Sequence, residues 1–532
     1  MHSPRGDEMT VRPHADRAVI LAYFILTAAY VAVFWIPRLP PLVDYPQHLA
    51  IAATLRRLFE PSSPEHATFV VNAWTYNGAF HFAVAALSYL VSIETAGKVL
   101  LSAIPVLTAL GAAHLTDVTG RPRWYGLALL PTSWSYAVGW GFINFALSVP
   151  LVWIGWCEWQ RWRTTRRRVH LVATVALGLL LSVLHMIGTA AFCLSIAASL
   201  FADAASLGKS WTSRIRGFRA RAWPAFPGGL VLVTLYLHSR YVPYDLWSYP
   251  GEGTDEPLWG KLVNLPEYVG GNLADHTDAA LVAAAAAVMG AIWWTAPSRT
   301  DSRPARMLAI VFSALYLLCP RIWMGTGIVF ERLALFACAF AVAATPLAAP
   351  RFATMARFAL ASVIALHAAN LVAHAAMFSE QEDADRILDD VPAGRRLIAL
   401  TYATRGEPVV RRDSWIHLAA FYPARRPGDI AYSFARYGGM PVHYRTPAEH
   451  PVPFDFEWDP KDYDPRADWA RSFDTALVRT PRSAPDADPR VRAFGADASR
   501  VDLMSHRGRF WLYDLSGIAR AANEERTWSE RP

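Results

Sequence analysis

The sequence predicts a mainly α-helical protein: a polytopic transmembrane bundle of about eleven spans, followed by a soluble external α/β domain. Three observations support this prediction. Of the 532 residues, 53% are hydrophobic and only 18% are charged, which is too apolar for a soluble enzyme of this size. The apolar residues gather in runs that can cross a bilayer, and the short loops between them hold much of the net charge of +7. After Met377 the composition becomes polar and charge-balanced.

The N-terminal part of the chain predicts the orientation of the bundle. Residues 1–17 carry three arginines, which predicts a cytoplasmic head. The first apolar run, Ala18–Ile36, then crosses outward, and Pro37-Arg38-Leu39-Pro40 follows it in place of a small-residue cleavage site, so we expect a retained anchor. Residues 45–60 are amphipathic and predict a helix that lies along the external membrane surface.

The remaining spans follow from the later apolar runs. These are Phe80–Ile93, Val99–Leu115, Trp124–Trp156, Leu171–Phe201, Gly228–Leu237, Ala279–Ala296, Met307–Cys319, Leu333–Ala344 and Phe358–Ala376. We expect Leu171–Phe201 to form a helical hairpin. Trp124–Trp156 is expected to cross once, because the basic loops 161–168 and 209–221 on either side of the hairpin both belong in the cytoplasm. Within it, Tyr136–Asn144 is interpreted as irregular backbone that lines a cavity at membrane depth.

The predicted organisation is a head (1–17), a transmembrane domain (18–377) with external loops 37–79 and 241–278, and an external soluble α/β domain (378–532). In the last part, Leu397–Tyr402, Ala476–Val478 and Arg509–Tyr513 predict strands. We expect the bundle in the inner (plasma) membrane, which makes the C-terminal domain periplasmic or extracellular. The charge in short loops is typical of membrane anchoring rather than nucleic-acid binding. The four cysteines lie in apolar runs and predict neither disulfides nor a zinc site.

The stretch Leu42-Val43-Asp44-Tyr45-Pro46-Gln47-His48-Leu49-Ala50 contains the strongest candidate for catalysis. Asp44 and His48 are four residues apart and share one helical face. An acid at the membrane face is partly removed from water, which suits it to accept a proton from a hydroxyl, and His48 can orient it or contact a phosphate. Asp44 before Tyr45-Pro46 also fits a helix N-cap, and the two roles are compatible.

Cations near the external membrane face are candidates to hold a lipid phosphate. They are Arg332, Arg321 and Arg240, together with His185 near the outer turn of the hairpin. The alternatives are an arginine that snorkels to the interface or pairs with Glu331, and a histidine that makes an interhelical hydrogen bond.

Candidate substrate contacts are Tyr45, His81 and Asn144. Asn144 lies among the rings and glycines of Trp134–Phe145, a stretch suited to an isoprenoid chain or a sugar face, although an aromatic belt at the interface also accounts for such rings. A buried amide needs partners, which favours a specific role for Asn144. The sequence has no histidine–glutamate spacing of the metalloprotease kind and no run of carboxylates, so it predicts no metal site and no other cofactor, and leaves dependence on a metal ion open.

The layout of the whole chain, and Leu42–Ala50 in particular, resembles the GT-C class of membrane glycosyltransferases, which use polyprenyl-phosphate-linked sugars. This resemblance implies a catalytic acid in the first external loop, here Asp44, and an external arginine for the donor phosphate. Many members have two adjacent acidic residues at this place, whereas Tyr45 follows Asp44 here. That departure argues against a metal-assisted variant.

We therefore predict an inverting membrane glycosyltransferase that moves a hexosyl or pentosyl group from a polyprenyl-phosphate donor to an acceptor hydroxyl at the external face, with Asp44 as general base. Its partners are the lipid-linked sugar, membrane lipids and an unidentified glycan, lipid or protein acceptor, but no nucleic acid. A transporter or flippase of a lipid-linked or small substrate is the main alternative, although no internal repeat is evident. A third possibility is a non-catalytic assembly or sensor protein whose external domain binds a partner, which an Asp44 buried in a salt bridge with no adjoining cavity would favour.

Overall fold

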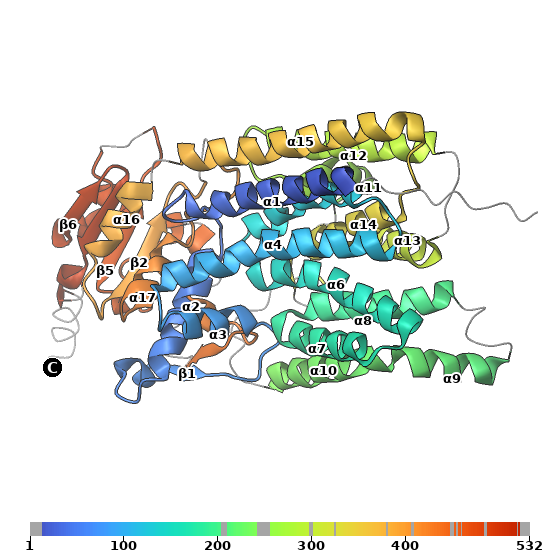
Figure 1. Ribbon diagram of the computed structural model, residues 1–532. Coiled ribbons are helices and arrows are strands. Elements are labelled where there is room, and N and C mark those ends of the chain that lie inside the picture. The colour runs from blue at the N-terminus through green and yellow to red at the C-terminus, as the bar shows by residue number, and fades with distance from the viewer. Residues whose placement is uncertain are drawn as a thin grey trace, which may run out of the picture.

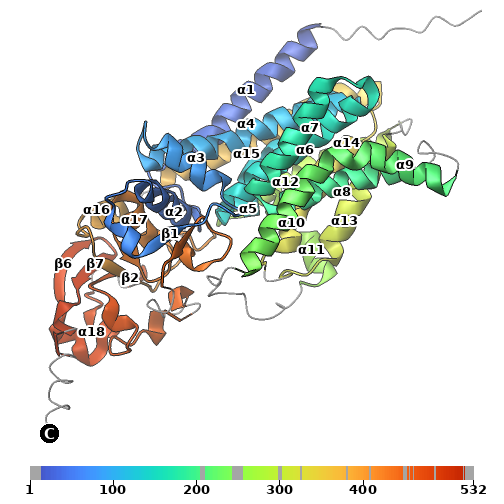
Figure 2. The ribbon, with the colours of Figure 1, turned by 90° about the horizontal axis from the view of Figure 1, so that it is seen from below.

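In the computed structural model the chain forms a bundle of long helices with a mixed α/β domain at one end (Figure 1). The structure describes residues 13–203, 210–241, 256–296, 302–323, 326–378, 381–405, 409–446, 452–453, 456–458, 460–483, 487–518 and 520–521. The view from below shows the C-terminal domain, coloured orange to red, at the end of the bundle where α2 and α3 lie (Figure 2).

The long bundle helices are α1 (Pro13–Trp35), α4 (Ile93–Val118), α6 (Ile143–Thr165), α7 (Arg168–Leu184), α8 (Met186–Ala202), α10 (Phe226–Tyr241), α12 (Thr277–Thr295), α13 (Arg303–Leu318), α14 (Val329–Ala344) and α15 (Pro350–Met377). Shorter elements accompany them: α2 (Tyr45–Leu58), α3 (Ala79–Leu87), the 3-10 helix η2 (Arg123–Trp134), α5 (Tyr136–Gly139), α9 (Trp211–Ala222), the 3-10 helix η4 (Trp223–Ala225) and α11 (Leu258–Gly270). Within the described ranges, four helices are long and apolar enough to cross a membrane: α1, α4, α12 and α15.

Local sequence signals set several helix ends. The Ser92 hydroxyl accepts a hydrogen bond from the Thr95 amide at 3.1 Å, so α4 begins at Ile93, and Glu94 in its first turn complements the helix dipole. His185 stands between α7 and α8 in an extended conformation, and its ring accepts from the Ile187 amide at 3.2 Å. The predicted hairpin over residues 171–201 is thereby confirmed.

The run Phe80–Ile93 does not cross the bundle, contrary to our expectation. α3 packs against α2, and Glu94 at the start of α4 pairs with Arg425 of the C-terminal domain at 2.7 Å, so both ends of the run lie at the same end of the molecule. The 9 residues of α3 also rise only about 14 Å, well short of a hydrocarbon core.

The stretch 124–156 traverses the bundle twice, not once as expected. η2 runs alongside α1, because the Tyr23 hydroxyl donates to the Arg123 carbonyl at 3.0 Å and the rings of Phe34 and Trp134 lie 6.0 Å apart. α6 then leads the chain back. A 3-10 helix rises about 2 Å per residue, so the 12 residues of η2 cover a distance that an α-helix of that length cannot. The crossing that Phe80–Ile93 does not make and the extra crossing of η2 therefore offset each other in the predicted total of about eleven.

The C-terminal domain contains a mixed sheet in the order β3-β2-β5-β7-β6. Its strands are β2 (Arg396–Thr401), β3 (Asp429–Ile430), β5 (Thr475–Arg479), β6 (Asp502–Arg507) and β7 (Phe510–Asp514). β2 is parallel to β3 and β5, and β7 is antiparallel to β5 and β6. The three predicted strands are confirmed as β2, β5 and β7. The helices of this part are α16 (Gln381–Asp389), α17 (Phe421–Arg425) and α18 (Arg490–Phe494), and the 3-10 helix η5 spans Leu418–Ala420.

The first loop after α1 is integrated into the C-terminal domain. β1 (Phe69–Val71) pairs antiparallel with β4 (Val442–Tyr444), and α2 packs against α17 (Figures 1 and 2). α2 forms as predicted, but it is almost wholly buried rather than lying on the membrane surface. The Gln47 amide donates to the Tyr432 carbonyl at 2.8 Å and accepts from the Phe434 amide, so the C-terminal domain covers the polar face that was expected to meet water.

Candidate active site between the bundle and the C-terminal domain

The backbone around Asp44 is attached to the irregular segment after η2. The Val43 amide donates to the Gly139 carbonyl at 3.1 Å, and the Asp44 amide donates to the Trp140 carbonyl at 3.0 Å. Gly141 has a φ of +82°, and a Cβ there would lie 2.7 Å from the Asp44 and Tyr45 nitrogens. Only glycine fits such a close approach in a left-handed conformation. This contact fixes the start of α2, and with it the carboxylate.

The Asp44 side chain faces the C-terminal domain. It does not cap α2, and the residue is 8% exposed. His417 Nε2 lies 3.4 Å from Asp44 Oδ1, and the His417 ring stacks on Tyr432 with centroids 4.9 Å apart. Among the residues that the structure describes, Asp44 Oδ2 has no hydrogen-bond partner. One oxygen is therefore held by an imidazole, and the other is available to accept a proton.

His48 of α2 pairs with His81 of α3, a contact that the sequence did not predict. His48 Nδ1 and His81 Nε2 are 2.9 Å apart, and the His48 ring packs edge-on against Phe80 and Phe434. Burial lowers the pKa of His48 to about 4, even though the nearby Asp44 carboxylate acts in the opposite direction. Burial and the neighbouring His48 also lower the pKa of His81. Both imidazoles are therefore neutral near pH 7, and one of them donates to the other.

Two of the expected substrate residues have structural roles. The Asn144 amide accepts from the Phe80 amide at 2.9 Å and donates to the Asn77 carbonyl at 2.9 Å, so it joins α6 to α3. The Tyr45 ring is fully buried against Phe421 with centroids 6.3 Å apart. These contacts position α2 and α3 around the site.

Three arginines surround the segment that holds Asp44. Arg412 stacks over the Tyr136 ring at 3.8 Å, and Arg321 donates to the Tyr136 hydroxyl at 3.2 Å. Arg332 lies 4.1 Å from the Phe142 ring centroid and is 6% exposed. Arg321 also pairs with Glu331 at 3.2 Å, whereas the sequence had suggested Glu331 as the alternative partner of Arg332. The acid and the cations thus approach the same short segment from different elements.

The other two predicted phosphate contacts are placed differently. His185 lies at the turn between α7 and α8, where its ring packs edge-on against Phe145 at 5.3 Å. Arg332 contacts the same Phe145 ring at 5.5 Å, so His185 is linked to the arginines through one side chain. Arg240 lies in the last turn of α10, and its side chain lies outside the described residues.

Buried polar atoms without partners gather along this junction. In the described part of the chain they include Trp140 Nε1, Ser135 Oγ, Asn272 Oδ1, Ser414 Oγ and His417 Nδ1. Buried polar groups are normally hydrogen-bonded, so such a concentration is typical of a place that receives a polar ligand or ordered water. No group of three or more potential metal ligands occurs within the described ranges.

Sequence reasoning did not find His417 or Arg412. Both lie on the segment after β2, and Asp44 is far from them along the chain. The stretch Arg411-Arg412-Asp413-Ser414-Trp415 is unusually polar for a segment whose residues prove partly or wholly buried, and this was the available signal. Arg412 also pairs with Glu267 at 2.8 Å, which ties the C-terminal domain to α11.

A multi-pass bundle that carries an acid-bearing helix beneath a C-terminal α/β domain defines a GT-C-like membrane fold. The chain is similar to ArnT from Cupriavidus metallidurans in the apo state, with a TM-score of 0.55, 12% sequence identity, and coverage of 95% of this chain and 99% of that chain. The same protein bound to undecaprenyl phosphate gives a TM-score of 0.58 at 12% identity, over 94% and 98% of the two chains. ArnT is a GT-C glycosyltransferase, so the predicted fold is confirmed. No protein-family model and no curated protein matches the chain.

Proposed function

We propose that the protein is an inverting glycosyltransferase that moves a hexosyl or pentosyl group from a polyprenyl-phosphate donor to an acceptor hydroxyl at the external face of the membrane. The observation that supports this most is that Asp44 and three arginines each contact the same segment, residues 136–142. A general base and a phosphate-binding cation are the two groups that such a transfer requires. The fold shared with a protein that binds undecaprenyl phosphate supports the lipid-linked donor.

In the proposed reaction, Asp44 Oδ2 takes the proton of the acceptor hydroxyl while His417 holds Oδ1. The hydroxyl oxygen attacks the anomeric carbon from the side opposite the phosphate. The bond between that carbon and the phosphate oxygen breaks, and the polyprenyl phosphate leaves with the electron pair. Inversion follows because bond formation and bond cleavage occur on opposite faces of the sugar. Base assistance contributes about 10²–10⁴-fold to such a step.

The departing phosphate needs positive charge in a place with little water. Arg332 is the favoured partner because it is buried beside the segment that holds Asp44. Arg321 and Arg412 are the further candidates from the same segment. Hydrogen bonds from a guanidinium to a phosphate are charge-assisted and are about twice as strong as neutral ones. We propose that the acceptor is a compound with a hydroxyl group and that the site faces the periplasmic or extracellular side of an inner membrane.

The test is transfer by purified Asp44→Asn protein in detergent with undecaprenyl-phosphate-linked hexoses and pentoses. We expect no release of undecaprenyl phosphate from any donor that the wild type uses, while binding of added undecaprenyl phosphate stays at the wild-type level. Arg332→Gln is expected to bind undecaprenyl phosphate more weakly than the wild type. Full transfer by Asp44→Asn would remove the proposed base, and alternating access to a substrate without any transfer would favour a transporter.

A further inference from the structure

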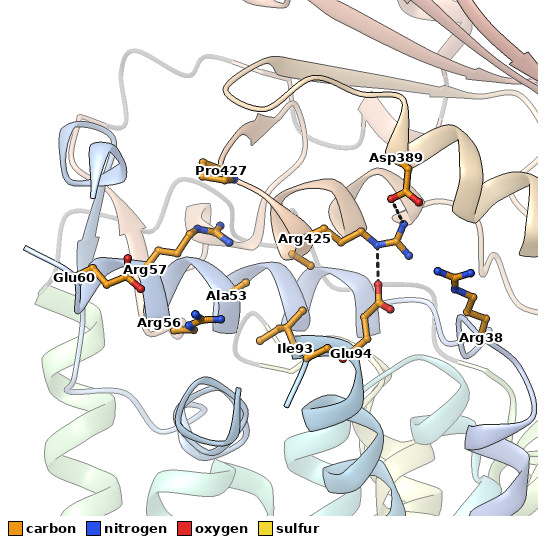
Figure 3. Close-up of a pocket in the computed structure, with 12 residues that line it drawn as sticks. Arg38, Ala53, Arg56, Arg57, Glu60, Ile93, Glu94, Asp389, Arg425 and Pro427 are labelled. Carbon is orange, nitrogen blue, oxygen red and sulfur yellow. Dashed lines mark hydrogen bonds and ion pairs between the residues drawn. The ribbon is translucent and has the colours of Figure 1, made fainter. Parts of the chain in front are cut away.

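A pocket separate from Asp44 lies at the other end of α2. Its volume is about 560 Å³, within the range of small-ligand sites. It is lined from α2, the start of α4, α17 and the linker after α1, and its cations are Arg38, Arg56, Arg57 and Arg425 (Figure 3). Arg56 lies twelve positions after Asp44, which is about 18 Å along the helix axis. The pocket is therefore not an extension of the candidate active site.

Most charges in this pocket already have partners. Arg57 pairs with Glu65 at 2.7 Å, and Arg425 pairs with Glu94 at 2.7 Å and also with Asp385. Among the described residues that line the pocket, the exceptions are Arg56 and Glu60, and the Glu60 side chain is exposed.

Arg56 contacts the Tyr89 ring at 5.2 Å, and its Nε is buried without a hydrogen-bond partner. Within the described residues no carboxylate pairs with its guanidinium. Arg38 reaches Asp385 at 2.8 Å, but 66% of its side chain is exposed, so it can donate to a further anion. The pocket thus presents one unneutralised guanidinium and one that is only partly engaged.

The rim of the pocket is apolar and exposed. Tyr89, Leu90 and Val91 are 56%, 83% and 39% exposed, directly before the pocket residues that start α4. Trp35 and Ile36, at the end of α1, are also exposed and lead into Arg38. On both sides, apolar side chains therefore end where guanidinium groups begin. This sequence of surfaces matches a lipid molecule, with acyl chains beside the apolar rim and the phosphate deeper in the pocket.

We propose that this pocket binds the phosphate-bearing headgroup of an anionic membrane phospholipid, with Arg56 and Arg38 as the phosphate contacts and Leu90 beside an acyl chain. A soluble phosphate compound would use the same guanidinium groups but has no use for the apolar rim, which is why the lipid is favoured. The bound headgroup neutralises Arg56 at the junction of α2, α4 and α17. It thereby ties the C-terminal domain to the membrane.

The test uses the full chain in detergent, with native mass spectrometry of retained lipid and thermal unfolding as readouts. The probes are dioleoylphosphatidylglycerol, dioleoylphosphatidylcholine and inorganic phosphate at matched concentrations. We expect the wild type to retain the anionic lipid at least about tenfold better than the zwitterionic one, and to gain no thermal stability from inorganic phosphate. Arg56→Gln is expected to lose about tenfold in affinity for the anionic lipid, because a charge-assisted hydrogen bond is removed.

Arg38→Gln provides a second variant that keeps the test decisive, since that side chain is largely exposed and its replacement leaves the fold intact. Leu90→Gln should weaken the binding of the anionic lipid. Arg167→Gln is the matched control, because it removes an exposed arginine between α6 and α7, at the opposite end of the bundle.

Equal retention of both lipids, or wild-type retention by both Arg56→Gln and Arg38→Gln, would overturn the site. If Arg167→Gln loses as much affinity for the anionic lipid as Arg56→Gln does, the binding is general electrostatic attraction, and the proposed site is overturned. Stabilisation by inorganic phosphate equal to that by the lipid would refute the membrane lipid as the ligand.

Discussion

Replacement of Gly141 by alanine tests whether the segment 136–142 sets the position of Asp44, the proposed general base. The φ of +82° costs an alanine about 1–2 kcal/mol. The added Cβ would also lie 2.7 Å from two backbone nitrogens, those of Asp44 and Tyr45, and an ordinary contact of 3.4 Å requires a shift of about 0.7 Å. A displacement of this size at a reacting group reduces a rate by about 10–100-fold. We expect such a loss in transfer, with the protein still folded.

Gly394→Ala is the matched control for this experiment. Gly394 has a φ of +81°, so alanine meets the same backbone cost, but nothing lies within 4 Å of the added Cβ. The assay is release of undecaprenyl phosphate from a donor that the wild type uses, with thermal unfolding measured on the same samples. Gly394→Ala should unfold earlier but keep wild-type turnover. If Gly141→Ala retains full turnover, or if both variants lose turnover equally, the positional argument is refuted.

Three further outcomes are expected. The pKa of His48 is about 4 in the folded protein and near 6.5 in the unfolded chain, so the unfolded state binds more protons between these two pH values. The free energy of unfolding should therefore be constant above about pH 6.5 and fall by about 3 kcal/mol towards pH 4. His48→Gln should flatten this part of the plot of unfolding free energy against pH, and an unchanged plot would contradict the assignment. Arg412→Lys loses the planar stack on Tyr136, which should lower the free energy of unfolding by about 1–2 kcal/mol in denaturant titrations, whereas no change would show that a point charge beside Glu267 suffices. Transfer should continue after treatment with EDTA, and recovery only on adding back a divalent cation would show a metal requirement.

The sequence predicted the helical bundle because apolar runs and basic loops are local signals. It also predicted β2, β5 and β7, whose apolar residues are bounded by turn residues. It did not predict that η2 traverses the bundle, because a stretch of 12 residues is too short for an α-helical span and no local sequence signal predicts a 3-10 conformation. The burial of α2 was equally inaccessible, since its polar face is covered by residues from the far end of the chain.

Asp44 and His48 could be selected from their spacing alone, because both lie on one turn of one helix. Their partners could not. His417 reaches Asp44, and Arg412 reaches Tyr136, only after the C-terminal domain has folded onto the bundle. Local sequence thus determined which elements form and which acid they present, because helix periodicity and charge act over a few residues. The tertiary structure alone decided which imidazole and which guanidinium groups meet that acid, because such contacts depend on packing between distant segments.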